Sequence, residues 1–137
     1  MSRISVALRR LVLSRARGYC EYCRLSQEGQ EATFHIDHII PRAAHGETVA
    51  ENLALACVSC SLRKAARQTA IDPQSGNEVA LYNPRRDVWH ECFQWEGVYV
   101  VGLTVGGRAT IAVLQMNRPL MLAIRQEAAA LGRHPPP

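Results

Sequence analysis

The chain has 137 residues, of which 47% are hydrophobic and 20% are charged, and its formal net charge is +4. This composition is typical of one globular domain and excludes wholesale disorder. The longest apolar runs, such as residues 98–103 and 109–114, are far too short to span a bilayer. The N-terminus has no uninterrupted apolar segment and no small-residue cleavage site, so we expect a cytoplasmic protein without a signal peptide.

Residues 5–17 are predicted to form an amphipathic helix. Ser5 is a suitable N-cap and Gly18 a suitable stop, and Leu8, Leu11, Val12 and Arg15 fall on one stripe of the helix. Three arginines lie off this stripe: Arg9, Arg10 and Arg17. They either clamp a nucleic-acid backbone or form a solvated helix face. The arginine excess, with Lys64 as the sole lysine, suits phosphate binding but equally fits a general composition bias.

Two Cys-x-x-Cys pairs, Cys20 with Cys23 and Cys57 with Cys60, predict a metal site. Each tight turn places two thiolates on one side of the chain, and two such turns complete a tetrahedral set of four ligands. Because no position is left for water, we expect a structural Zn²⁺ that does not catalyse. Cys92 lies outside the set and is expected to be a buried free thiol.

Between the two pairs, residues 33–36 and 53–56 are predicted to form an antiparallel hairpin. Asp37 and His38 then lie where the first strand ends. The loop 41–51 is polar, and residues 59–69 are predicted to form a helix that packs across the hairpin.

The second half of the sequence is predicted to fold around this core. A turn at residues 72–77 leads into a strand at 78–82, and residues 93–95 and 98–103 form a second hairpin. Helices are expected at 108–116 and at 118–131, the latter capped by Asn117 with Pro119 in its first turn. With no convincing boundary, residues 1–137 are expected to form one domain, with a core at about 18–70 and an extension at about 71–134.

A composite motif carries a family resemblance. It consists of Asp37-His38-Ile39-Ile40-Pro41, then Asn52-Leu53, then Cys57-x-x-Cys60 followed by Lys64. This combination resembles the zinc-stapled HNH endonuclease family. A weaker likeness to small stand-alone bacterial members continues through Asp72-Pro73, Tyr82-Asn83-Pro84-Arg85, Trp89-His90-Glu91 and Gly102-Leu103-Thr104 to about Arg125.

The resemblance implies an α+β fold: a ββα-metal core stapled by the four cysteines, with an N-terminal helix and a C-terminal hairpin plus helices. It also implies hydrolysis of phosphodiester bonds in DNA with Mg²⁺ or another divalent ion. His38 would be the general base and Asp37 a ligand of that ion. Asn52 would brace the loop through amide hydrogen bonds to the backbone. No membrane partner or small-molecule cofactor is expected, and the oligomeric state is left open.

The chain departs from the family pattern at Ser61. Relatives usually carry His or Asn directly after the last cysteine, as the second ligand of the catalytic ion. Ser61 either holds the ion through its hydroxyl or a water, or the site is weakened and the protein binds nucleic acid without cleaving it. The residues that could compensate are His35, His45 and Ser59.

Five residues are candidate nucleic-acid contacts: His35, His45, Arg63, Lys64 and Arg67. For the last three, a solvated helix face is an equal alternative.

Overall fold

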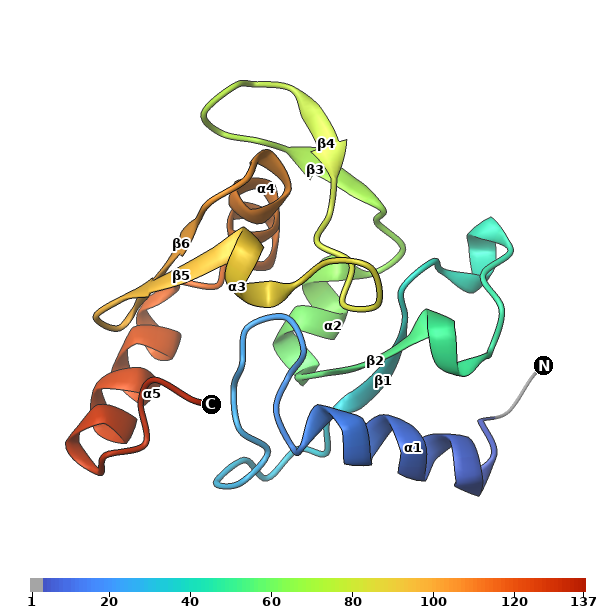
Figure 1. Cartoon of the computed structure of the whole chain (residues 1–137), viewed down its shortest axis with the longest axis horizontal. Coiled ribbons are helices and arrows are strands. Elements are labelled where there is room, and N and C mark those ends of the chain that lie inside the picture. The colour runs from blue at the N-terminus through green and yellow to red at the C-terminus, as the bar shows by residue number, and fades with distance from the viewer. Residues whose placement is uncertain (1–3) are drawn as a thin grey trace. The chain divides into compact units, whose positions relative to one another are not determined.

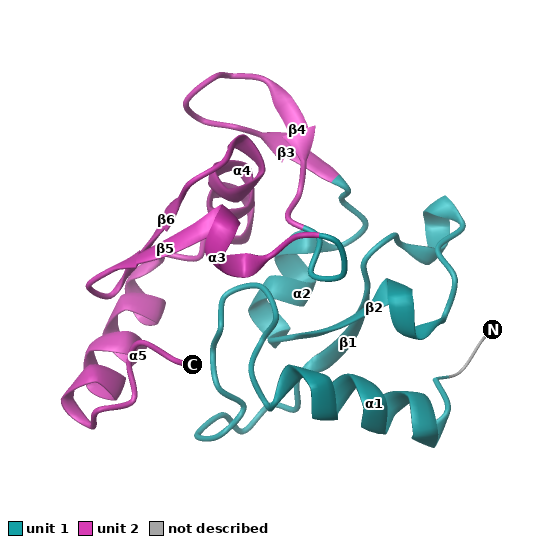
Figure 2. Ribbon diagram, viewed as in Figure 1, with its two compact units in different colours: residues 1–68, 83–86 teal, residues 69–82, 87–137 magenta. Residues whose placement is uncertain are grey.

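The computed structural model describes residues 4–137, a mixture of helices and two-stranded sheets (Figure 1). The chain divides into two compact units (Figure 2). Unit 1 runs through Gln68 and includes the later segment Asn83–Arg86, whereas unit 2 comprises Thr69–Tyr82 and the chain from Asp87 onward. The expected single domain stays a prediction. In the described part of the chain, no helix is both long and apolar enough to cross a membrane.

The described residues of unit 1 form a two-stranded hairpin with a helix before it and a helix after it in the sequence. Its elements are α1 (Val6–Ala16), β1 (His35–His38), the 3₁₀ turns η1 (Arg42–Ala44) and η2 (Ala50–Asn52), β2 (Leu53–Ala56) and α2 (Val58–Lys64). The strands β1 and β2 pair antiparallel, and both α1 and α2 pack on this hairpin. All four residues of β2 are buried, so this strand forms the centre of the unit.

The N-terminal helix α1 begins as predicted. The hydroxyl of Ser5 accepts a hydrogen bond from the backbone N–H of Leu8 at 3.1 Å, and the helix ends where Arg17 adopts a left-handed conformation. The predicted stripe is only partly right, because Leu11 is 46% exposed. The buried residues are Val12 and Ala16, which lie four apart on the side that packs against β2.

The first strand of the hairpin was predicted two residues too early. The N–H of Phe34 donates to the side-chain oxygen of Gln27 at 2.7 Å instead of joining the sheet, and pairing begins at His35. Asp37 and His38 therefore lie within β1, opposite Ala54 and Leu53, and not after its end.

The helix α2 is shorter than the predicted 59–69. Its Ala65 has a positive φ of 48° and ends the helix, after which residues 69–71 form a strand, β3, that the sequence did not predict. The β3 strand pairs with β4 (Glu78–Ala80), so the predicted strand at 78–82 is confirmed for its first three residues.

Unit 2 continues with α3 (Trp89–Cys92), β5 (Phe93–Glu96), β6 (Tyr99–Gly102), α4 (Val105–Leu114) and α5 (Pro119–Ala130). The antiparallel β5–β6 pair confirms the predicted second hairpin. The helix α4 begins three residues earlier than expected, because Thr104 caps it by accepting the N–H of Gly107 at 3.0 Å.

The predicted cap of α5 was wrong. Arg118 occupies the N-cap position, and Pro119 is the first helical residue. The side chain of Asn117 instead bonds both backbone groups of Val100, accepting from its N–H at 2.9 Å and donating to its carbonyl at 2.8 Å.

A buried ion pair lies inside unit 2. Asp72 is 0% exposed, and each of its carboxylate oxygens lies 2.9 Å from a guanidinium nitrogen of Arg108. Because these bonds favour the ionised form, Arg108 and then Ser75 hold the pKa of Asp72 below its usual value.

Candidate metal centre and catalytic groove

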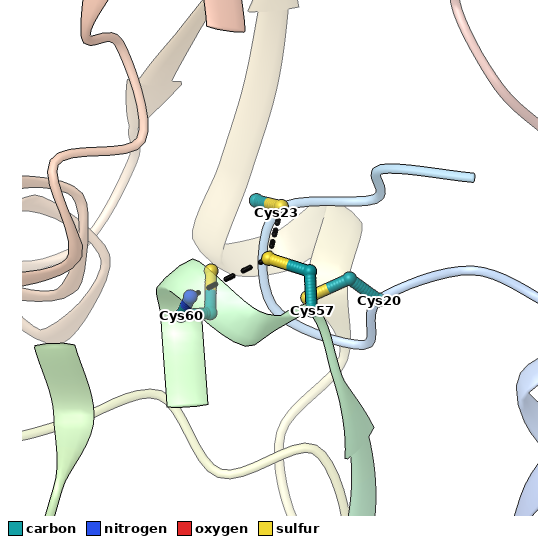
Figure 3. Close-up of side chains that lie close together, drawn as sticks. All are labelled: Cys20, Cys23, Cys57 and Cys60. Carbon is teal, nitrogen blue, oxygen red and sulfur yellow. Dashed lines mark hydrogen bonds between the residues drawn. The ribbon is translucent and has the colours of Figure 1, made fainter. Parts of the chain in front are cut away.

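The four predicted cysteines form one buried cluster in unit 1 (Figure 3). All four Sγ atoms lie within 4.8 Å of one another, and Cys23 Sγ is 3.7 Å from Cys57 Sγ. In a tetrahedral site with Zn–S bonds of about 2.3 Å, neighbouring sulfurs lie about 3.8 Å apart. The spacing therefore fits a four-coordinate metal ion, and the structure brings together all four predicted ligands.

The four thiols shift one another's pKa values in opposite directions: the pKa of Cys23 and of Cys60 is raised, chiefly by their hydrogen bonds with Cys20. Hydrogen bonds from the other thiols, that of Cys20 first, hold the pKa of Cys57 far below its ordinary value. Cys57 also caps α2, since its sulfur accepts the N–H of Cys60 at 3.4 Å. Cys92 lies in unit 2 and is half-buried, so it is outside this cluster.

Glu21, between the first two cysteines, fastens their turn to β2. Its N–H donates to the carbonyl of Leu55, and its carboxylate accepts the N–H of the same residue, both at 2.8 Å. The other carboxylate oxygen forms an ion pair with Arg85. Glu21 is buried, so this arginine supplies the charge that offsets the buried carboxylate.

Asp37 is held by two donors on the same oxygen. Lys64 Nζ lies 3.1 Å from Oδ2, and the hydroxyl of Tyr22 donates to Oδ2 at 3.2 Å. Within the described residues, Oδ1 accepts no hydrogen bond. Burial raises the pKa of Asp37, and the charge of Lys64 opposes this effect.

Lys64 is therefore not on the surface. It is 2% exposed, and its ammonium also donates to the carbonyl of His38 at 3.0 Å. The solvated helix face expected as one alternative is wrong for this residue, and its ammonium is directed at Asp37 instead of outward to a phosphate.

His38 is half-buried at the end of β1. Its Nε2 lies 2.9 Å from the hydroxyl of Thr48, in the loop that follows η1. Burial lowers the pKa of His38, and the positive charge of Arg42 lowers it further, while Asp37 acts in the opposite direction. The imidazole is thus biased toward its neutral form.

Asn52 makes the backbone hydrogen bonds that the resemblance implied. Its Oδ1 accepts the N–H of Ile40 at 2.8 Å, and its Nδ2 donates to the carbonyls of Ile40 at 3.0 Å and Glu47 at 2.8 Å. Gly46 packs against the same carbonyl, because a Cβ built there would lie 1.7 Å from the oxygen of Ile40. The loop after His38 is thereby closed on itself.

At the start of β1, His35 is exposed, and its Nδ1 lies 2.9 Å from the hydroxyl of Ser61 on α2. Ser61 and Lys64 are three residues apart on α2, while His35 and Asp37 are two apart on β1. Each helix residue contacts one strand residue. These two contacts align α2 with one face of β1.

A groove of about 580 Å³ lies in unit 1. It is lined by the candidates His35, Asp37, His38 and Ser61 and by two arginines, Arg9 and Arg42. Asn52 and Lys64 support the lining residues without lining the groove. The remaining candidates, His45, Arg63 and Arg67, do not line it either, and the guanidinium of Arg63 donates to Ser59 at 3.1 Å.

Sequence reasoning missed three contributors to this site: Tyr22, Arg42 and Thr48. Arg42 had a signal, since a basic residue directly follows Pro41 of the motif. Tyr22 and Thr48 had none, because their hydrogen bonds to Asp37 and His38 depend on chain segments that meet only in the fold.

The fold and site define a mixed α/β protein with a four-cysteine cluster able to hold a metal ion and an acidic residue beside histidines in a groove. The family model for HNH endonuclease matches residues 20–67, which span the cysteine cluster and the motif from Asp37 to Lys64. The resemblance is confirmed for this segment, and metal-dependent nuclease activity is indicated at the level of the family. No curated protein matches the chain.

Proposed function

We propose that the protein is a divalent-metal-dependent endonuclease that hydrolyses phosphodiester bonds in DNA. The ββα-metal core would consist of β1, β2 and α2, stapled by Zn²⁺ at the four cysteines. One observation carries this proposal: Asp37, His38 and Ser61 line a single groove together with Arg9 and Arg42. The groove combines a hard oxygen ligand, a base and two phosphate-binding side chains.

The divalent ion is assigned to the Asp37 side of the groove, next to Ser61. A bound Mg²⁺ would supply charge relief at the phosphate and at the leaving oxygen. Asp37 suits this position, because Lys64 and Tyr22 fix Oδ2 and leave Oδ1 without a protein donor. Lys64 is thus assigned to Asp37 and not to DNA.

His38 is assigned as the general base. If Nε2 carries the proton and donates it to Thr48, Nδ1 keeps its lone pair and can accept a proton from water. The oxygen of that water attacks phosphorus and the bond to the leaving oxygen breaks. The lowered pKa of His38 favours the neutral imidazole, and Asn52 holds the loop that follows it.

The DNA backbone is assigned to the arginines of the groove. Arg9 and Arg42 line it directly, and the exposed His45 and Arg67, with Arg63, extend the contact beyond it. These contacts go to phosphates, so they position the strand without reading its sequence. The cytoplasmic location stays a prediction.

A second candidate function is a zinc-stabilised module that binds nucleic acid without cleaving it. Two observations favour it: a neutral hydroxyl stands where relatives carry an imidazole or amide, and Lys64 already offsets the charge of Asp37. Both would weaken the affinity of the groove for a divalent ion.

Plasmid nicking in Mg²⁺, Mn²⁺ and Ni²⁺ separates the two functions. We expect the native chain to cleave, and His38→Ala to lower the rate by about 10²–10⁴-fold, the usual contribution of a general base. DNA binding and zinc content should be unchanged in that variant. His90→Ala is the matched control, because His90 is an exposed histidine in unit 2. Binding without cleavage in all three ions would establish the second function instead.

A further inference from the structure

The hydrogen bond between His35 and Ser61 indicates which residue could replace the second metal ligand, the His or Asn that the family pattern has at the position of Ser61. Residues two apart on a strand face the same side, so His35 and Asp37 project from one face of β1. Both line the groove. The hydroxyl of Ser61, at the position of the missing ligand, lies 2.9 Å from Nδ1 of His35.

We propose that His35 is the nitrogen ligand of the divalent ion at Asp37, and that Ser61 orients the ring and is not a ligand itself. This inference rests on the ion assigned to Asp37 under the proposed function. Metal-binding histidines generally donate their other ring N–H to an oxygen acceptor, which fixes the tautomer. With Nδ1–H donated to Ser61, the Nε2 lone pair is available to a metal.

The same arrangement occurs at Asp37. Its Oδ2 is held by Lys64 from α2, while Oδ1 accepts no hydrogen bond from the described residues. Each of the two strand residues therefore has one atom fixed by the helix and one atom left for an ion. The face of β1 thus offers a carboxylate oxygen and an imidazole nitrogen.

The other candidates for the missing ligand fit less well. His45 ends the turn η1 in a left-handed conformation and does not line the groove. Ser59 already accepts the guanidinium N–H of Arg63 and is also outside the lining. A neutral hydroxyl at Ser61 is a poorer ligand for a transition metal than imidazole.

An imidazole among the ligands of the divalent ion has a measurable consequence for metal preference. Affinities of nitrogen-containing sites rise from Mn²⁺ to Ni²⁺, whereas Mg²⁺ prefers oxygen ligands. His35 should therefore favour Ni²⁺ over Mg²⁺, and its removal should reduce Ni²⁺ affinity more than Mg²⁺ affinity. A residue that only stabilised the fold would change both affinities alike.

Titration calorimetry on the full zinc-loaded chain tests this directly, with Ni²⁺ and Mg²⁺ as probes and zinc content measured before and after. We expect one Ni²⁺ beyond the zinc, at least tenfold weaker binding in His35→Ala, and a smaller change for Mg²⁺. Ser61→Ala should weaken Ni²⁺ binding by about tenfold, the lower end for loss of an orienting partner. His90→Ala is the control and should bind as the native chain does.

A spectroscopic measurement tests the ligand assignment without relying on binding affinities. Electron spin echo of bound Mn²⁺ should show nitrogen coupling in the native chain and in His90→Ala, and none in His35→Ala. The double variant His35→Ala with Ser61→His should regain the coupling and the Ni²⁺ affinity, because an imidazole returns from the helix side. Melting temperatures identify any variant that fails to fold, and His35→Gln then replaces His35→Ala.

Failure of the His35 assignment and failure of the nuclease proposal give different results. If the native chain binds Ni²⁺ with nitrogen coupling lost in His35→Ala but cleaves no DNA, the ligand assignment stands and the nuclease proposal is wrong. If the chain cleaves DNA and His35→Ala keeps its coupling and its Ni²⁺ affinity, the assignment is overturned. Absence of any Ni²⁺ beyond the cysteine cluster, or equal losses for Ni²⁺ and Mg²⁺, overturns it as well.

Discussion

Lys64 and Asp37 form a buried ion pair, with Nζ 3.1 Å from Oδ2 and side-chain exposures of 3% and 9%. The only lysine of the chain thus lies beneath the candidate groove, where it neutralises the residue assigned to the divalent ion. Removal of one partner from a buried pair leaves a charge without compensation, which is more costly than the net value of the pair.

Lys64→Met should therefore destabilise unit 1 by about 3 kcal/mol or more. Arg67→Met is the matched control, since Arg67 is exposed just beyond the end of α2. Urea unfolding of the zinc-loaded proteins measures the difference. Equal free energies of unfolding for the two variants would contradict the buried pair.

Cys57→Ser should release the metal and unfold much of unit 1, because binding of a structural metal is also folding free energy. Cys92→Ser is the control, since Cys92 lies outside the cluster and should leave one zinc per chain. Metal analysis and melting temperature, each with and without a chelator, provide the comparison. A metal-free native chain with an undiminished melting temperature would show that the cluster has no structural role.

Gly46→Ala should disturb the loop that Asn52 closes. The added methyl group would overlap the carbonyl of Ile40, which must move and loosen its bond with the Asn52 amide. Overpacking of this kind costs about 1–3 kcal/mol, and cleavage should slow because the loop follows His38. Ala43→Gly, an exposed change of one methyl group in the same loop, should have little effect on either. Similar melting temperatures and rates in both variants would refute the close contact.

Acidification should weaken unit 2 through Asp72. Arg108 holds the pKa of this carboxyl below its usual value, so the folded state binds the proton less readily than the unfolded state. The resulting stability is present above the unfolded pKa of about 3.9 and is lost as the pH falls toward the lower folded value.

Asp72→Asn removes this contribution at every pH. Its melting temperature should be lower than that of the native chain at pH 7, and the gap should narrow as both are acidified below about pH 4. Melting curves across this range provide the measurement. A gap that stays constant with pH would show that the Asp72–Arg108 pair does not contribute in this way.

Local signals in the sequence predicted much of this structure. The cysteine spacing predicts the cluster because each Cys-x-x-Cys turn is a local geometry, and Ser5 predicts its helix start for the same reason. The hydrogen bonds of Asn52 were implied by family resemblance alone.

The predictions that failed concern features that depend on tertiary contacts. The strand shift to His35 follows from a side-chain bond of Gln27, and Asn117 leaves the cap of α5 because Val100 offers it two backbone partners. The burial of Lys64 depends on which face of α2 meets β1, and the pattern of residues 59–69 does not encode that face. The same docking brings Ser61 to His35.

The ion pair between Arg85 and Glu21 has a consequence for synthesis. Arg85 comes from the segment Asn83–Arg86, which completes unit 1 although residues 69–82 belong to unit 2. A nascent polypeptide that has left the ribosome only as far as Gln68 holds all four clustered cysteines but lacks the guanidinium that offsets Glu21. Glu21 therefore gains its counterion only after the intervening residues have been translated, and an excised fragment of residues 20–67 would retain a buried carboxylate without it.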